Sequence, residues 1–450
     1  MFYFKDNIYR GLGEKAFCDW KALSSKKLLP RFLAAGKLVG TTHIDPTAEG
    51  IPPDLIQGWA AVLKHQIIPF VSYPYEWAFS MLKDAALLQL ELLLAALDED
   101  MILKDSSSFN IQWFGTTPAF IDIPSFEILQ PHEPWIGYRQ FCQLFLYPLF
   151  LQAYKNVDFH PWLRGSIDGI TPEQFNNLMS IRDLFRPGIF SNVFLQTNIQ
   201  KRYGATNRDL KDELKKACFN KKLIEANVRR IQKLVQNLEW ERSKSEWSNY
   251  ASTHSYSDSD HNRKAEFVRE TVSLRRWSLV WDIGCNTGMF SKIAAKNADC
   301  VIAMDSDHLA IDLLYRNLSE DGFKNVLPLV ANITDASPNL GWRGLERKDL
   351  VGRGKPELTL CLALIHHVVI GTNVPLQEFV QWLASLHTSL VIEFVTKDDD
   401  MVKTLLRNKE DHYTDYDIEN FEKHLAGSFK LIRKEVLESR TRILYYAEPV

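Results

Sequence analysis

The fold of the C-terminal half is decided by Leu279-Val280-Trp281-Asp282-Ile283-Gly284-Cys285-Asn286-Thr287-Gly288-Met289-Phe290. An apolar run that ends in an acid and continues into a glycine-containing turn is the pattern of a buried strand, a tight turn and a helix. Glycines 284 and 288 allow backbone angles that a β-carbon would block, and they let a ligand approach the main chain closely. The helix after the turn, about Phe290 to Lys296, would direct its free amide groups at that ligand. We therefore expect a strand–turn–helix that forms one wall of a binding site.

The spacing of the glycines separates two kinds of nucleotide-type ligand. A dinucleotide fingerprint requires Gly-x-Gly-x-x-Gly, but Asn286 and Met289 stand where its second and third glycines would be. The form Asp-x-Gly-x-Asn-x-Gly instead resembles motif I of class I S-adenosylmethionine (SAM) methyltransferases. In that family the turn faces the methionine part of the cofactor. The resemblance implies that the cofactor is bound here by Asp282, Gly284, Cys285, Asn286 and Gly288.

Two further predicted strands carry the other residues that we expect to bind the nucleoside. Cys300–Met304 reads as the second strand and ends at Asp305, about 20 residues past the turn, where an acid can accept both ribose hydroxyls. Val326–Val330 reads as the third strand, and in relatives of this fold the adenine lies at its end. The predicted nucleoside ligands are therefore Asp305, Ser306, Asn332 and Ile333.

The fourth predicted strand, Leu358–Leu364, leads directly into His366 and His367. Strand ends on this side of an open parallel sheet face the binding crevice, so Leu364 is expected against the cofactor. A histidine at that place can accept a proton from the attacking hydroxyl or amine. We therefore predict that His366 and His367 are catalytic, although hydrogen bonding within the fold would explain them equally. A fifth strand, Ser389–Val395, and a closing pair, Phe429–Lys434 and Arg440–Ala447, complete the pattern.

A charged segment connects the two halves of the chain. Residues 207–240 lack glycine and proline, and their apolar residues recur at helical spacing, which predicts a helical connector. Tyr250, between this connector and the glycine turn, is predicted to stack on the cofactor or to close on the acceptor. A packed aromatic hinge is the alternative for Tyr250.

The N-terminal part contains two recognisable elements and one polar constellation. Ile67–Val71 reads as a strand, and residues 78–97 read as a helix that is apolar around most of its surface and therefore buried. A predicted hairpin follows, with Asp105 before it, Asn110 at its start and Asp122 at its end.

The order and spacing of these three polar residues resemble the catalytic loop and metal-binding acid of protein kinases. This resemblance implies a nucleotide or metal site at Asp105, Asn110 and Asp122. Leu103 replaces the histidine of that pattern, and we find neither a glycine-rich loop nor a convincing strand lysine. Two interpretations stay open: a degenerate kinase-like domain, or an unrelated α+β domain in which the three residues cap a hairpin.

Composition restricts the function classes. The net charge is −3, so no overall basic field attracts nucleic acid, and a nucleic-acid partner is not expected. Six scattered cysteines without a Cys-x-x-Cys pair indicate free thiols in a reducing compartment and no metal site. The most apolar runs are too short to span a bilayer, and the N-terminus lacks a signal-peptide pattern. We therefore expect a cytoplasmic protein.

The whole chain resembles bacterial proteins described as class I SAM-dependent methyltransferases or NoeA-type nodulation proteins. The resemblance is carried by the glycine turn, the two histidines, residues 73–77, residues 103–110 and residues 138–142. It implies an α/β fold: a Rossmann-like methyltransferase domain with a mixed seven-stranded sheet, preceded by an α+β domain that is kinase-like in one interpretation. The expected boundaries are 1–204, 205–245 for the helical connector, and 246–450.

The function that follows is SAM-dependent methyl transfer to oxygen of a glycan or small metabolite, with the N-terminal domain recognising the acceptor or regulating the reaction. The cofactor would be S-adenosyl-L-methionine. One alternative is a bifunctional or regulatory protein with a nucleotide-binding kinase-like domain, and another is a SAM-binding pseudoenzyme. The sequence identifies neither the acceptor nor the oligomeric state.

Overall fold

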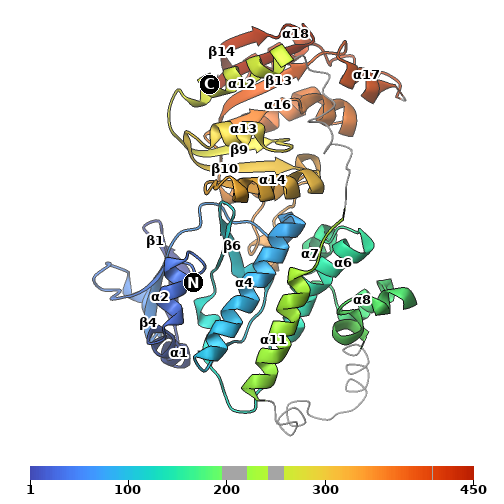
Figure 1. Cartoon of the computed structure of the whole chain (residues 1–450). Coiled ribbons are helices and arrows are strands. Elements are labelled where there is room, and N and C mark those ends of the chain that lie inside the picture. The colour runs from blue at the N-terminus through green and yellow to red at the C-terminus, as the bar shows by residue number, and fades with distance from the viewer. Residues whose placement is uncertain (195–219, 242–257, 408) are drawn as a thin grey trace. The chain divides into compact units, whose positions relative to one another are not determined.

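The computed structural model describes residues 1–194, 220–241, 258–407 and 409–450 (Figure 1). The chain divides into two compact units, Met1–Glu241 and Arg242–Val450. Tyr250, predicted to stack on the cofactor, lies outside the described residues. No helix in the described ranges combines the length and the apolar character needed to cross a membrane.

The first unit begins with an antiparallel four-stranded sheet in the order β1-β2-β4-β3. Its strands are β1 (Phe2–Phe4), β2 (Asn7–Leu12), β3 (Thr41–Ile44) and β4 (Ala61–His65). The prediction of a strand at Ile67–Val71 is wrong, because the strand lies earlier, at β4. Pro69 has no amide hydrogen to donate to a neighbouring strand, whereas Ala61, Val62 and Leu63 are buried in the sheet.

Helix α4 (Phe79–Asp98) is the centre of the first unit, and the predicted buried helix is confirmed there. Most of its residues are buried, on all sides of the helix. Helix α11 (Lys221–Gln236) packs against α4 and buries Ile224, Val228, Ile231 and Val235. The helical spacing found in the predicted connector therefore corresponds to a helix that belongs to the first unit.

Two small two-stranded sheets and a helical layer complete this unit. The paired strands are β5 (Met101–Leu103) with β8 (Phe126–Ile128), and β6 (Ile111–Phe114) with β7 (Thr117–Phe120), and the second pair is a hairpin. The other α-helices are α1 (Glu14–Ser24), α2 (Leu28–Ala34), α3 (Pro53–Ile56), α5 (Tyr138–Phe141), α6 (Tyr147–Lys155), α7 (His160–Gly165) and α8 (Pro172–Leu178).

The second unit is built on a mixed seven-stranded sheet in the order β11-β10-β9-β12-β13-β15-β14. The first five strands of that order are parallel, and β15 is antiparallel to both of its neighbours. The strands are β9 (Trp277–Ile283), β10 (Ala298–Asp305), β11 (Val326–Val330), β12 (Leu358–Cys361), β13 (Ser389–Val395), β14 (Phe429–Val436) and β15 (Arg442–Pro449). This order confirms the predicted Rossmann-like sheet of a class I methyltransferase.

The helices of the second unit alternate with the parallel strands and cover the sheet (Figure 1). They are α12 (Asp258–Val272), α13 (Met289–Ala294), α14 (His308–Glu320), α15 (Leu350–Arg353), α16 (Leu376–Ser385), α17 (Asp400–Leu406) and α18 (Ile418–Ala426). Strand β13 is buried at every position, which explains its continuous apolar run with one acid, since a central strand is covered on both faces.

The order of the sheet reverses next to β9. The chain moves from β9 outward through β10 to β11, and then returns to place β12 on the other side of β9. In open α/β sheets such a switch point leaves a crevice outside the carboxyl ends of the strands, and ligands bind there. The fold therefore positions the glycine turn after β9 at the edge of this crevice.

Candidate functional site

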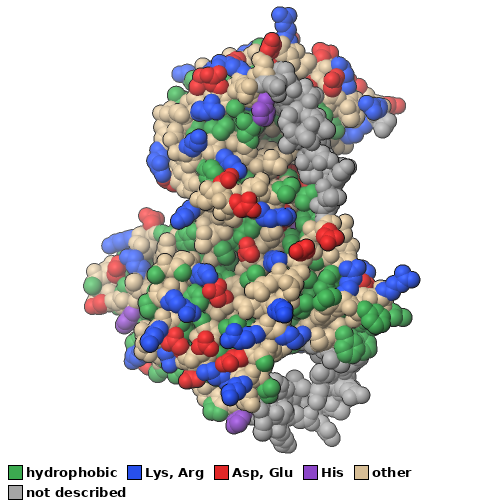
Figure 2. Space-filling view, viewed as in Figure 1, with side chains coloured by type: hydrophobic (Ala, Val, Ile, Leu, Met, Phe, Trp, Pro, Cys, Tyr) green, Lys and Arg blue, Asp and Glu red, His purple; other side chains and the backbone are tan. Residues whose placement is uncertain are grey.

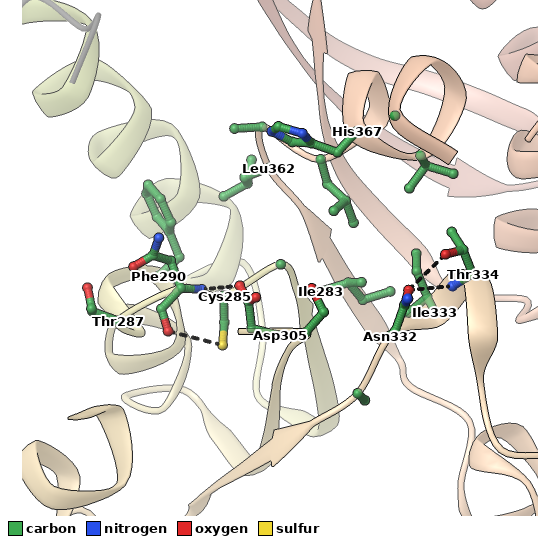
Figure 3. Close-up of a pocket in the computed structure, with 18 of the residues that line it drawn as sticks. Ile283, Cys285, Thr287, Phe290, Asp305, Asn332, Ile333, Thr334, Leu362 and His367 are labelled. Carbon is green, nitrogen blue, oxygen red and sulfur yellow. Dashed lines mark hydrogen bonds between the residues drawn. The ribbon is translucent and has the colours of Figure 1, made fainter. Parts of the chain in front are cut away.

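A cavity of about 630 Å³ lies at this switch point (Figure 3). Its volume is within the range of about 300–1,000 Å³ that is common for small-molecule and cofactor sites. The walls come from the ends of β9, β10, β11 and β12 and from helix α12. Of the residues predicted to bind the cofactor, those that line it are Gly284, Cys285, Asn286, Asp305, Ser306, Asn332, Ile333 and Leu364.

The glycine turn forms one wall by adopting backbone angles that are rare for L-residues. Gly284, Asn286 and Gly288 all have positive φ values, of 75°, 49° and 77°. The amides of Gly284 and Cys285 both donate to the carbonyl of Met304, at 2.8 and 3.0 Å. The turn is thus tied to the end of β10, and its outer side faces the cavity.

Gly288 is the position where this turn tolerates a side chain least. A β-carbon at Gly288 would lie 2.3 Å from the side chain of Leu314, and the positive φ would strain any L-residue there. We expect Gly288→Ala to lower the free energy of unfolding by about 2 kcal/mol or more. Urea unfolding followed by circular dichroism measures this. Gly322→Ala is the matched control, because Gly322 has a similar φ of 74° with nothing within 4 Å. Equal losses in the two variants would show that the packing against Leu314 is unimportant.

Asp305 is held rigidly at the edge of the cavity. One carboxylate oxygen accepts the amide of Asn286 at 2.9 Å, and the other accepts the amide of Asp307 at 2.9 Å. Burial raises the pKa of Asp305, while these amides act in the opposite direction. Each carboxylate oxygen can accept more than one hydrogen bond, so this fixed group can also bind two neighbouring hydroxyls of a ligand.

On the far side of Asp305, Asn332 and Ile333 line the cavity after β11 (Figure 3). The side-chain oxygen of Asn332 accepts the amide of Thr334 at 3.0 Å and its hydroxyl at 2.8 Å. This fixes the plane of the side-chain amide. Beside this side chain, Ile333 adds apolar surface to the cavity wall, so the region combines apolar surface with one oriented amide, which suits a flat heteroaromatic ring.

The chain after β12 turns sharply. The predicted strand Leu358–Leu364 ends early, at Cys361, because Ala363 has a φ of 51°. A non-glycine residue in this conformation costs free energy, and here it brings Leu364 against Gly284, with a Leu364 carbon 3.1 Å from the position of a β-carbon on that glycine. The strained residue lies in the cavity wall, where the carboxyl end of β12 meets the glycine turn.

The two predicted catalytic histidines have different surroundings. His367 lines the cavity (Figure 3), whereas His366 has an exposed fraction of 0% and is not part of the wall. The centroids of the two rings lie 4.1 Å apart, and the ring planes are tilted by 40°. Burial, then the charge of Arg442, lowers the pKa of His367 to about 4, and burial lowers the pKa of His366 well below its usual value. Both rings are therefore neutral at pH 7, and only His367 can meet a ligand in this cavity.

Asp282 lies behind the wall of the cavity. Its exposed fraction is 1%, it is not among the lining residues, and it accepts the hydroxyl of Ser291 at 2.5 Å. Burial raises its pKa to about 6, although Ser291 and Lys264 counteract this effect. Whether its carboxylate touches a ligand directly, as predicted from the sequence, stays a prediction.

Helix α12 contributes two polar residues that sequence reasoning did not identify, His261 and Lys264. Lys264 pairs with the buried Glu393 of β13, with 2.5 Å between the Nζ and Oε2 atoms. Glu393 also accepts a hydrogen bond from Arg442, which in turn binds Asp399. The only signal in the sequence was the acid in the otherwise apolar strand Ser389–Val395, because a buried carboxylate requires a cation.

The first unit contains the three polar residues that were predicted as a nucleotide or metal site, Asp105, Asn110 and Asp122. The carbonyl of Asn110 accepts the amide of Ile121 at 2.8 Å, beside Asp122. Burial and the negative charge of Asp122 raise the pKa of Asp105, so the two carboxylates lie near each other. Arg10 of β2 forms an ion pair with Asp122. Within the described part of the chain, these acids do not belong to a group of three ligands close enough to share a metal ion.

Comparison with known proteins identifies the family. No protein-family model matches the chain. Nodulation protein NoeA of Rhizobium meliloti (strain 1021) is 32% identical over 452 residues, which covers 100% of this chain and 93% of that protein. The chain belongs to the NoeA family. The alignment with NoeA covers both units, so the family assignment applies to the N-terminal unit as well as to the C-terminal one.

Two solved structures show a more distant similarity. The N-methyltransferase NodS from Bradyrhizobium japonicum is 11% identical and covers 43% of this chain and 98% of its own, with a TM-score of 0.32. The bifunctional kinase-methyltransferase WbdD is 16% identical and covers 43% of this chain and 40% of its own, with a TM-score of 0.31. TM-scores of this size are too low to assign a fold, so the fold assignment depends on the strand order of the seven-stranded sheet.

Proposed function

We propose that this member of the NoeA family is a SAM-dependent methyltransferase whose C-terminal unit binds the cofactor and catalyses the reaction. The observation that carries the proposal is the cavity at the switch point of the seven-stranded sheet. It combines a glycine turn, a rigid carboxylate and an apolar wall with an oriented amide. These are the chemical groups that a nucleoside attached to an amino acid requires.

The residues of the cavity fit S-adenosylmethionine part by part. The carboxylate of Asp305 would accept the two ribose hydroxyls, as acids at this place in the fold do. Asn332 and Ile333 would contact the adenine, and the turn from Gly284 to Gly288 would contact the amino-acid part. When bound, the cofactor supplies a methyl group activated by a positively charged sulfur. The protein contributes by aligning the acceptor atom and excluding water, and alignment alone can supply about 7–11 kcal/mol.

His367 is the residue best placed to take the acceptor's proton. It is neutral at pH 7 and lines the cavity, so a ring nitrogen can accept a proton as the methyl group is transferred. We expect His367→Gln to lower kcat by about 100-fold or more. The affinity for S-adenosylhomocysteine should change by less than about threefold, because the ring is not needed to hold the product. Steady-state kinetics and calorimetry on the same preparations measure both. An unchanged kcat would mean that alignment is sufficient and that no base acts at this position.

The cofactor proposal is tested by titrating the full-length protein with SAM and S-adenosylhomocysteine in a calorimeter. We expect micromolar dissociation constants and a loss of at least about 30-fold in Asp305→Ala, because two charge-assisted hydrogen bonds are removed. Asp321→Ala is the matched control, since Asp321 is an exposed acid paired with Lys292 on the same unit. Absence of binding by the unaltered protein would refute the proposal.

For the acceptor, we propose oxygen of a glycan or of a small metabolite, with the N-terminal unit recognising it or regulating the reaction. The strand after residue 358 does not continue into the Asn-Pro-Pro-aromatic motif of nucleobase amino-methylases. On the face drawn in Figure 2, acidic and basic side chains alternate over the described residues, which offers no extended basic surface for a polyanion. Transfer of a labelled methyl group into fractionated cell extract would identify the acceptor class, and label in nucleic acid would refute this part.

A second candidate function is nucleotide binding by the N-terminal unit, and the neighbouring acids Asp105 and Asp122 favour it. ATP with magnesium would then raise the melting temperature of the full-length protein, and Asp122→Ala would remove the increase. An unchanged melting temperature would leave the unit as a scaffold or acceptor-recognition domain.

A third alternative concerns the C-terminal unit. If SAM binds but no fraction of the extract is methylated, a SAM-binding pseudoenzyme becomes the better interpretation.

A further inference from the structure

One surface segment of the first unit carries a group of exposed apolar side chains. It comprises residues 178–190, which begin at the end of helix α8 and include a short 3₁₀-helix, Ile181–Phe185; we call it the apolar turn. Single exposed apolar residues are common, but a group of them marks an interaction site. Figure 2 shows hydrophobic side chains on the surface here, beside the position of α8 in Figure 1. The exposed side chains are Leu178 (38%), Ile181 (81%), Phe185 (88%) and Phe190 (52%).

A buried acid holds the apolar turn in one conformation. Asp183 is 4% exposed, and its Oδ2 atom accepts the amide of Ser180 at 2.8 Å and the hydroxyl of Ser180 at 2.7 Å. The Nζ atom of Lys155 lies 2.9 Å from the same oxygen, and Nε of Arg186 lies 3.1 Å from Oδ1. The amide of Arg186 donates to the carbonyl of Asp183 at 2.9 Å, and the amide of Ile189 donates to the carbonyl of Arg186 at 3.2 Å. The exposed side chains therefore project from a backbone that is fixed from within.

The charge beside these apolar side chains is positive. Asp183 is the only acid in residues 178–190, and it is already paired with Lys155 and Arg186. Arg182 and Arg186 are both exposed, and the guanidinium of Arg186 lies 5.1 Å from the ring centroid of Tyr154. Three cations therefore accompany one acid, and an anionic partner is favoured.

Two features favour a lipid surface over a protein partner. A specific protein interface usually contains about 20–30 residues on each side, whereas the apolar turn offers four exposed apolar side chains. A second copy of this chain would meet the turn through the same surface in an isologous contact, which would bring the arginines of both copies together. A bilayer requires no shaped pocket, because apolar side chains enter the region below the headgroups while arginines stay among the anionic headgroups.

We propose that the apolar turn binds the surface of an anionic membrane, with Ile181 and Phe185 inserted below the headgroups and Arg182 in contact with them. The first unit would lie on the bilayer without spanning it. This inference goes beyond the proposed function and does not depend on it, because none of these residues lines the cavity of the second unit.

Co-sedimentation of the full-length protein with lipid vesicles tests the proposal. We expect binding to vesicles of phosphatidylcholine and phosphatidylglycerol at low salt. Binding should be at least about tenfold weaker with phosphatidylcholine alone or at high salt, since the attraction of the arginines is then removed or screened. The double variant Ile181→Ser, Phe185→Ser should bind at least about 30-fold more weakly, because two apolar side chains no longer leave water. Arg182→Gln should bind about fivefold more weakly.

The matched control is Ile136→Ser, which removes another exposed apolar side chain of the same unit (65% exposed) and should leave vesicle binding unchanged. The melting temperature of each variant shows whether it is folded. Should the double variant be unstable, Arg182→Gln and the two kinds of vesicle decide the question without it.

Two vesicle results would overturn the proposal: no binding of the unaltered protein to the anionic vesicles, or equal binding by the unaltered protein and the folded double variant. Sedimentation velocity without vesicles tests a second copy as the occupant. We expect the same oligomeric state for the unaltered protein and the double variant. If the substitutions converted a dimer into a monomer, the apolar turn would be a contact between copies and the membrane proposal would be wrong.

Discussion

Replacing Arg442 by methionine is expected to lower the free energy of unfolding of the C-terminal unit by about 3–5 kcal/mol, because it breaks a buried ion-pair network. The side chain of Arg442 is 2% exposed. It binds Asp399 through Nε at 2.7 Å and Nη2 at 3.1 Å, and Glu393 through Nη1 at 3.1 Å. Without it, Asp399 and Glu393 stay buried with Lys264 as the one cation of the network. Urea unfolding monitored by far-ultraviolet circular dichroism measures the loss.

The control for Arg442 is an ion pair of the same chemistry at the surface of the same unit. Arg276 binds Asp299 with side chains 68% and 58% exposed. Arg276→Met should change the free energy of unfolding by less than about 1 kcal/mol, since water solvates both charges of an exposed pair. If Arg442→Met were no more destabilising than Arg276→Met, the buried network would not be a source of stability.

Replacing Asp282 by asparagine is expected to stabilise the ligand-free protein at pH 7.5 while it weakens cofactor binding. The folded state raises the pKa of Asp282 from 3.8 to about 6, so it favours the neutral carboxyl group. The stability from this group is fully present below about pH 4 and is lost as the pH rises through 6. At 1.36 kcal/mol per pKa unit, the ionised group costs about 3 kcal/mol at pH 7.5. Asparagine is neutral and keeps an oxygen that can accept the hydroxyl of Ser291.

Two measurements test this prediction. In urea unfolding, the advantage of Asp282→Asn should be largest at pH 7.5 and fall to about half at pH 5, where the wild-type carboxyl group is mostly protonated in the folded state. In calorimetry, the variant should bind SAM at least about tenfold more weakly, because it lacks the negative charge that lies near the ammonium group of the bound cofactor. A variant that is less stable than the wild type at pH 7.5, or one with unaltered affinity, would contradict the assignment. Opposite effects on stability and binding are typical of functional sites.

The central strands of the C-terminal sheet could be predicted one by one because most of their residues are buried. Val326–Val330 and Ser389–Val395 match β11 and β13 at both ends, since a short, predominantly apolar run is typical of a strand that is covered on both faces. The fourth strand was predicted three residues too long. Its apolar residues continue to Leu364, but the positive φ of Ala363 is imposed by packing against the glycine turn, and no local pattern announces it.

The N-terminal unit was harder to predict because its strands are short and lie on small sheets. Ile67–Val71 has strand-forming residues, yet the chain places its strand at Ala61–His65. Pairing partners decide the position of such a strand, and the partners here, β2 and β3, come from distant residues. The buried helix Phe79–Asp98 needed no partner information, because its apolar surface exceeds what any exposed helix carries.

The sequence alone was enough for features that depend on local backbone chemistry: the glycine turn after β9, the acid at the end of β10 and the alternation of strands and helices. These follow from which dihedral angles a residue tolerates and from which residues leave water. Only the tertiary structure decided that His367 faces the cavity while His366 is buried behind it, and that Lys264, Glu393 and Arg442 form one network. Such residues meet because the packing of the whole sheet removes their charges from water and leaves them no partners but one another.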